Sequence, residues 1–229
     1  MLSVAKVASA GGAANYYAQE DNYYFLGEQS TKWFGEGAKR LGLEGTVEKD
    51  TFKQVLEGHL PDGSDLSHIR NGENVHRAGY DYTFSAPKSV SLLALIQGDK
   101  EVLNAHKSAV EKAMMEIESL ASTRSMETQE KGIVETKNLV SALFLHDTNR
   151  NLEPHLHTHA IVANATYDEN TEKFKTLSTD KTGNSKGFVE VTWNNKIALG
   201  KLYRSFLKEE LAAQGFEFEH TGKNGLWEI

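Results

Sequence analysis

The chain contains no cysteine and only three prolines among its 229 residues. The lack of cysteine excludes disulfides, thiolate zinc sites and a cysteine nucleophile, and it is consistent with a reducing cytoplasm. No apolar run approaches the length that spans a membrane, so we expect no membrane insertion. The N-terminal segment MLSVAKVASA suggests a signal peptide only superficially, because Lys6 interrupts its short apolar run.

Positive charge is also scarce, with 25 lysines and arginines against 32 acidic residues and a formal net charge of −7. This balance argues against indiscriminate binding of nucleic acid. A local basic groove or a metal ion can still contact phosphate in an acidic protein. Residues 68–77 and the lysines from Lys173 to Lys208 are candidates for such a surface, although a solvated surface of mixed charge is the simpler interpretation for most of them.

Apolar periodicity and turn residues divide the chain into alternating strands and helices. We expect strands at 2–8, 80–86, 138–146, 156–164, 216–220 and 226–229, and helices at 13–20, 35–43, 49–58, 89–97, 99–122 and 194–215. Residues 58–79 are rich in turn formers and should be largely loop. The pattern predicts an α+β fold, a two-layer sandwich with helices over a central, mostly antiparallel sheet.

Four of the nine histidines lie within the fourteen residues from His146 to His159. The apolar segment before this run and the alternating segment after it predict a β-hairpin, with a turn at DTNRNLEP. Side chains repeat with a period of two along a strand, so His155, His157 and His159 should share one face. A histidine cluster of this kind predicts a metal site.

Spacing limits which of these histidines share an ion. His155 and His159 are about 13 Å apart along a strand that rises about 3.3 Å per residue, whereas metal–nitrogen bonds are about 2 Å long. An adjacent H-x-H pair can bind one ion if His146 on the partner strand supplies a third ligand. Spacing alone leaves open which pair is used, and a solvated hairpin with chance histidines is the alternative.

A second cluster stands near the N-terminus, where Asn-Tyr-Tyr recurs after seven residues as Tyr16-Tyr17 and Tyr23-Tyr24. Seven residues are nearly two helical turns, so the pairs could share a helix face and pack in the core. Their polar neighbours are poor core context, and buried hydroxyls need partners. A reactive or base-stacking surface therefore explains them slightly better. A tyrosine nucleophile, with a pKa near 10, would need a carboxylate or a metal ion nearby.

Three segments together resemble a known family: the tyrosine pairs, YDYTFSAPKSVS at 80–91, and HDTNRNLEPHLHTHAIVAN at 146–164. They resemble the N-terminal relaxase domain of conjugative plasmid proteins of the TraI/TrwC (MobF) type, within the HUH endonuclease superfamily. The resemblance covers essentially the whole chain. The tyrosines precede the histidines, as in relaxases and unlike replication initiators. The resemblance implies a five-stranded antiparallel sheet flanked by helices, and a cleft for single-stranded DNA.

The resemblance also implies an activity, the site- and strand-specific nicking and rejoining of DNA at a plasmid origin of transfer during bacterial conjugation. A tyrosine attacks the scissile phosphate and leaves a free 3′-hydroxyl and a 5′-phosphotyrosine link. By match, Tyr16 is the first nucleophile and Tyr17 its neighbour. Tyr23 and Tyr24 are candidates for a second transesterification that ends transfer.

The same resemblance assigns one divalent metal ion to His146, His157 and His159, and leaves His155 outside the site. Asp81 matches an acidic residue that orients a metal histidine or assists proton removal. Cellular abundance favours Mg²⁺ or Mn²⁺, although three imidazoles also suit Zn²⁺, Co²⁺ or Ni²⁺.

The resemblance further implies a single relaxase domain over residues 1–229. Because the chain stops inside an apparent strand, we expect an excised N-terminal fragment of a longer relaxase-helicase. No P-loop pattern occurs, so we expect no ATPase activity from this piece. The implied partners are single-stranded DNA at the origin of transfer, other relaxosome proteins and the coupling protein of a type IV secretion system. We expect a monomer in the bacterial cytoplasm that is transferred with DNA to the recipient cell.

Two other functions fit the same residues. A hydrolytic metalloenzyme would use the three histidines to activate water, and it would form no covalent intermediate. A single-strand DNA-binding module would stack bases on the tyrosines, and it would neither cut DNA nor respond to chelation.

Overall fold

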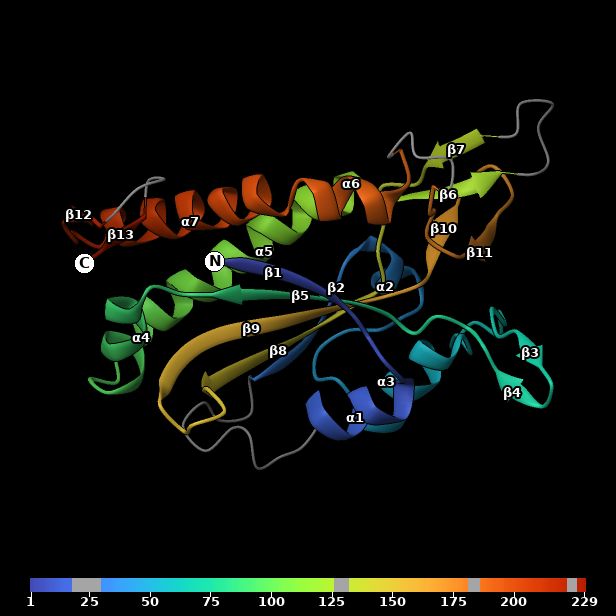
Figure 1. The fold of residues 1–229 in the computed structure, drawn as a ribbon, viewed down its shortest axis with the longest axis horizontal. Helices are drawn as coiled ribbons and strands as arrows, with labels where there is room; N and C mark the ends of the chain where they lie inside the picture. Colours follow the sequence, from blue (N-terminus) through green and yellow to red (C-terminus); the bar gives the residue numbers. More distant parts are fainter. Residues whose placement is uncertain (18–29, 126–131, 181–185, 222–225) are drawn as a thin grey trace.

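A computed structural model describes residues 1–17, 30–125, 132–180, 186–221 and 226–229 (Figure 1). Within these ranges five strands form a central sheet in the order β1-β5-β9-β8-β2, and all neighbours are antiparallel. The strands are β1 (Leu2–Lys6), β2 (Thr31–Phe34), β5 (Gly79–Ser85), β8 (Ser141–Thr148) and β9 (Pro154–Ala163). The predicted antiparallel sheet is therefore confirmed.

Helices cover both faces of this sheet (Figure 1). The first face packs against α4 (Lys88–Leu95), α5 (Lys100–Ser119) and α7 (Lys196–Ala213). The second face packs against α1 (Ala10–Tyr17), α2 (Glu36–Arg40) and α3 (Lys49–Glu57). Alternate residues of β8 enter opposite cores, with Leu143 in the first and Phe144 in the second. The predicted α+β class is confirmed, and helices on the second face add a layer to the two predicted.

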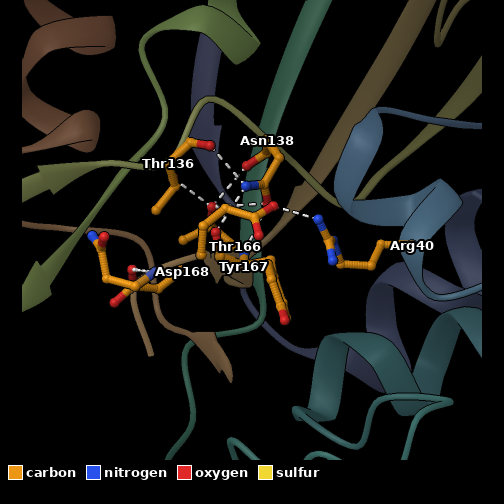
Figure 2. A network of polar contacts seen from close by, with 8 residues as sticks. Arg40, Thr136, Asn138, Thr166, Tyr167 and Asp168 are labelled. Atoms are coloured by element: carbon orange, nitrogen blue, oxygen red, sulfur yellow. Dashed lines mark hydrogen bonds and ion pairs between the residues drawn. The ribbon is translucent and has the colours of Figure 1, made fainter. Parts of the chain in front are cut away.

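The smaller elements extend from this framework. They are α6 (Phe188–Asn194) and the two-stranded pairs β3 (Ile69–Arg70) with β4 (Glu73–Asn74), β6 (Ser122–Ser125) with β7 (Gly132–Glu135), β10 (Thr166–Asp168) with β11 (Lys173–Lys175), and β12 (Glu219–His220) with β13 (Trp227–Glu228). Figure 2 shows how polar contacts hold β10. The Asn138 side-chain amide donates to the carbonyls of Thr136 and Tyr167, each at 2.8 Å. The Arg40 guanidinium lies over the Tyr167 ring, 3.9 Å from its centroid, and joins this region to α2.

Helix boundaries differ from the sequence prediction where capping side chains act. Helix α1 begins at Ala10 rather than residue 13, and the Ser9 hydroxyl accepts from the Gly12 N–H at 3.1 Å. Asp99 caps α5 through the N–H groups of Glu101 and Val102. The strand β2 and the helix α6 were not predicted, because four and seven residues carry little periodicity. In the described part of the chain, no helix is long and apolar enough to cross a membrane.

A buried histidine couples the first core to the strand that carries the histidine cluster. His106 on α5 contacts the Tyr203 hydroxyl through Nδ1 at 2.8 Å and the Thr158 hydroxyl through Nε2 at 2.9 Å. Thr158 lies between His157 and His159 on β9, and its side chain faces the first core. Burial lowers the pKa of His106 from 6.5 to about 3, so the folded protein keeps this ring neutral.

This burial predicts acid sensitivity. Between the unfolded and folded pKa values of His106 the unfolded chain binds more protons, so stability rises with pH and falls on acidification. From about pH 6 to about pH 4 we expect the wild type to lose about 2 kcal/mol more unfolding free energy than His106→Asn. Urea unfolding of both proteins at each pH measures the difference. If the unfolding free energies of the two proteins changed in parallel with pH, His106 would have the same pKa in the folded and unfolded states, and the prediction would be wrong.

Candidate active site

Three histidines converge on the second face of the sheet, at the end of the β8–β9 hairpin. His146 on β8 pairs in register with His157 on β9, and His159 pairs with Phe144. Each of His146, His157 and His159 offers one ring nitrogen, and these nitrogens all lie within 4.8 Å of one another. No other group of three or more such side chains comes this close in the described ranges. The predicted histidine hairpin is confirmed as a structure.

His155 shares the predicted face but lies outside this trio. Its ring centroid is 4.9 Å from that of His157, and the two rings are tilted by 32°. Its backbone carbonyl accepts a hydrogen bond from His157 Nδ1 at 2.8 Å. The geometry therefore brings together the H-x-H pair His157 and His159 with His146, which spacing alone left open.

Hydrogen bonds at Nδ1 fix the tautomers of His157 and His159. Asp81 Oδ2 lies 2.8 Å from His159 Nδ1, and the Thr83 hydroxyl lies 3.2 Å from the same nitrogen. The Thr83 hydroxyl also donates to Asp81 Oδ1 at 3.1 Å. Because a carboxylate and a carbonyl only accept, Nδ1 of both His159 and His157 must donate. Each Nε2 lone pair is then left to bind a cation.

The environment also keeps His146 and His157 neutral. Burial, followed by the neighbouring histidines, lowers the pKa of His146 from 6.5 to about 3. Burial also lowers the pKa of His157 to about 4, against the opposing effect of its hydrogen bond to the His155 carbonyl. Neutral imidazoles are the form that binds metal ions, so protons compete little with a cation at neutral pH.

Tyr17 is held by the same carboxylate that orients His159. Its hydroxyl donates to Asp81 Oδ2 at 2.8 Å, and its ring packs on Phe144 with centroids 5.6 Å apart. Burial first, and then the Asp81 charge and hydrogen bond, raise the pKa of Tyr17 well above its ordinary value. Its phenolate is therefore scarce, and Tyr17 is a poor nucleophile in this arrangement.

Tyr16 has the opposite environment, because half of its surface is exposed. Its ring centroid lies 6.1 Å from that of His146 and 6.2 Å from that of His159. The Tyr16 ring meets the Tyr17 ring edge to face, with centroids 4.8 Å apart. The structure thus places both tyrosines of the first predicted pair beside the histidine trio. Tyr23 and Tyr24 lie outside the described residues.

A cavity of about 480 Å³, here called the histidine cavity, opens beside Tyr16. Its walls are the four histidines of the hairpin, Tyr16, Thr83 and Ser85 of β5, and Thr148, Asn149, Arg150 and Leu152 around the hairpin turn. Sequence reasoning missed Thr83, Ser85 and Arg150. Alternation along β5 could have found Thr83 and Ser85, because they share the face of Asp81.

Comparison with known proteins gives this site a family. Residues 10–229 match the family model described as TrwC relaxase, so the chain belongs to the TrwC relaxase family. It is 54% identical over 229 residues to the multifunctional conjugation protein TraI of Escherichia coli strain K12, and 52% identical to a second Escherichia coli protein of the same name. The match covers the whole chain but spans only 13% of the length of either relative.

Two solved structures of TrwC also match the entire chain. The metal-bound conjugative relaxase TrwC in complex with oriT DNA has a TM-score of 0.85 and 34% identity, with 75% of that chain covered. TrwC complexed with a 27-mer DNA that comprises the recognition hairpin and the cleavage site has a TM-score of 0.82 and 33% identity, with 74% covered. The sheet and its helices are therefore the relaxase fold that the sequence predicted.

Proposed function

We propose that this chain nicks and rejoins one DNA strand at a plasmid origin of transfer during bacterial conjugation, through a covalent link to Tyr16. One observation carries the proposal: an exposed tyrosine stands beside three convergent histidines at an open cavity. The relatives support the substrate, since TrwC has been solved with oriT DNA and TraI is a conjugation protein.

We assign one divalent cation to His146, His157 and His159. The donor set fits, because burial holds the pKa of His146 and of His157 well below 6.5 and the Nδ1 contacts of His157 and His159 leave Nε2 available. TrwC has a metal-bound and a copper-bound structure, which supports a metal in this family. Mg²⁺ or Mn²⁺ is our choice on abundance, and Zn²⁺, Co²⁺ or Ni²⁺ also suits imidazole. A bound cation supplies positive charge that polarises the scissile phosphate.

The proposed reaction is a transesterification between Tyr16 and the scissile phosphate. The Tyr16 Oη attacks the phosphorus, the Oη–P bond forms, and the P–O3′ bond breaks. Tyr16 gives up its proton to solvent or a base, and the departing oxygen takes up a proton as a 3′-hydroxyl. One phosphodiester replaces another, so the reaction can run backwards and rejoin the strand. Tyr17 holds Asp81 in place, and Tyr23 and Tyr24 are left for a second transesterification.

The direct test is incubation with origin-strand oligonucleotides and Mn²⁺, followed by denaturing electrophoresis. A protein–DNA adduct that survives denaturation and appears together with a free 3′-hydroxyl product is the expected result. Cutting without any adduct would indicate the hydrolase instead. Binding without cutting, unaffected by chelation, would indicate the DNA-binding module.

Asp81 should set the metal affinity of the site although it is not a ligand. Its carboxylate holds His159 Nδ1–H and so raises the basicity of Nε2. We expect Asp81→Asn to weaken Mn²⁺ binding about 10- to 100-fold, as measured by calorimetric titration. Thr83→Val is the comparison variant: it removes the hydroxyl contacts to the same nitrogen and to Asp81 but keeps the carboxylate, so it should have a smaller effect. Equal affinities for Asp81→Asn and the wild type would show that the carboxylate does not act through His159.

Family membership also leads us to propose the wider setting. Other relaxosome proteins and the coupling protein of a type IV secretion system are the proposed partners. We place the chain in the bacterial cytoplasm as a monomer that travels with the transferred strand. Co-purification with tagged coupling protein from conjugating cells tests this setting separately from the chemistry.

A further inference from the structure

A second hollow shares Tyr16 with the histidine cavity as a lining residue. Its volume is about 240 Å³, half that of the histidine cavity. Residues 5–9, Gly12 and Ala13 form one side, and Tyr16, Tyr17 and Asp81 form the other. We call it the β1–α1 hollow, because its lining residues come largely from the end of edge strand β1, from α1 and from the turn between them. Figure 1 shows this turn of the chain. Tyr16 lines both spaces, so a DNA strand held at Tyr16 can continue into either.

The geometry of phosphoryl transfer decides what each space must hold. The attacking and leaving oxygens lie roughly in line across the phosphorus. With Tyr16 Oη as the attacking atom, the departing O3′ and its nucleoside lie on the far side of the phosphorus from Tyr16. The other nucleoside stays bonded to the phosphorus through O5′, which is not in line, so it remains beside Tyr16 when the link forms.

The two spaces match these two requirements. The histidine cavity extends from Tyr16 past the trio to Arg150 and Leu152 at the hairpin turn, which suits the departing side of the strand. The β1–α1 hollow borders both tyrosines and reaches no histidine, which suits the retained side. The volume of the β1–α1 hollow, half that of the histidine cavity, suits a single nucleoside.

The residues of the β1–α1 hollow keep it open. Ala5, Ala8 and Gly12 are exposed and carry little or no side chain. The Val7 N–H donates to the Gly79 carbonyl at 3.0 Å, so that donor is already used within the sheet. The wall therefore offers small, largely apolar surface. A nucleoside can pack on such a wall.

We propose that the β1–α1 hollow binds the first nucleoside on the retained side of the cut, the one that stays linked to Tyr16 through its 5′-phosphate. This inference rests on the proposed function. It adds a positioning site for the covalent intermediate, and it gives a role to β1 and the turn that follows it.

The test compares two substrates that share the same departing 3′-oxygen. One is an origin-strand oligonucleotide that continues past the cut. In the other, a methyl phosphodiester replaces everything after the scissile phosphate, so nothing enters the hollow. Both reactions form an Oη–P bond and release the same 3′-hydroxyl product. We expect Ala8→Trp, which fills the hollow, to lower the ratio of the two rates, continuous over methyl, by at least about tenfold.

Ala213→Trp is the matched control, because Ala213 is an exposed alanine at the end of α7, outside both spaces. Its rate ratio should equal that of the wild type. Ala8→Leu fills less of the hollow and should lower the ratio less, which keeps the test decisive if the tryptophan variant folds poorly. An unchanged ratio in folded Ala8→Trp or Ala8→Leu would overturn the proposal. A wild-type protein that forms no adduct with either substrate would instead overturn the proposed function and this inference with it.

Discussion

Replacing Tyr16 with phenylalanine should abolish the covalent protein–DNA adduct and lower nicking by at least about 1,000-fold. The change removes one oxygen atom and leaves the ring that contacts Tyr17 and the histidines. DNA binding should persist, because the aromatic surface is retained. Adduct yield on denaturing gels, alongside a fluorescence binding titration, separates the two effects.

Tyr17→Phe is the matched control for this loss. Its hydroxyl is engaged with Asp81, and burial and that carboxylate raise its pKa. We expect the adduct to form at a rate within about tenfold of the wild type. If Tyr17→Phe lost the adduct and Tyr16→Phe kept it, Tyr17 rather than Tyr16 would be the first nucleophile. Robust adduct without any of the four tyrosine hydroxyls would overturn the mechanism.

Replacing His157 with alanine should have the second large effect, a fall in nicking of at least about 100-fold even at saturating Mn²⁺. His157 is buried at the centre of the site, with ring centroids 5.2 Å from His146 and 5.0 Å from His159. Its loss leaves two ligands and a void between them. Nicking rates across a Mn²⁺ titration measure the effect.

His155→Ala supplies the control on the same strand and the same face. His155 lies next to the trio without belonging to it, and it supports His157 through its backbone carbonyl, which alanine retains. Because His155 also lines the histidine cavity, we expect a fall in nicking of less than about tenfold, with the Mn²⁺ dependence of the wild type. Equal losses in His155→Ala and His157→Ala would contradict the assignment of the ligands.

The sequence predicted those parts of the site that depend on local pattern. The hairpin from His146 to His159 followed from alternation and a polar turn, and the structure confirms both strands. The shared face of the three β9 histidines followed from the period of two. Spacing could exclude His155 and His159 as ligands of one ion, because they are about 13 Å apart along the strand. Which H-x-H pair lies opposite His146 depends on the register of β8 on β9, which local pattern does not show.

Contacts between distant segments had no such pattern to reveal them. Asp81 meets Tyr17 across 64 residues and His159 across 78 residues, and only the order of strands in the sheet brings them together. The unequal environments of the adjacent Tyr16 and Tyr17 were also hidden, because they depend on the end of α1 and on Phe144. The pairing of β2 with β8 was also hidden, since β2 is too short to show alternation.

The measurement that tests the central claim most directly is mass-spectrometric mapping of the residue linked to DNA. No lysine or arginine lies between Lys6 and Lys32, so a tryptic peptide would carry all four tyrosines. Cleavage after Glu20 separates Tyr16 and Tyr17 from the second pair, and fragmentation then distinguishes the neighbours. The first nicking reaction should place the nucleotide on Tyr16. Nicked DNA with no linked peptide, or a link on any other residue, would contradict Tyr16 as the first nucleophile.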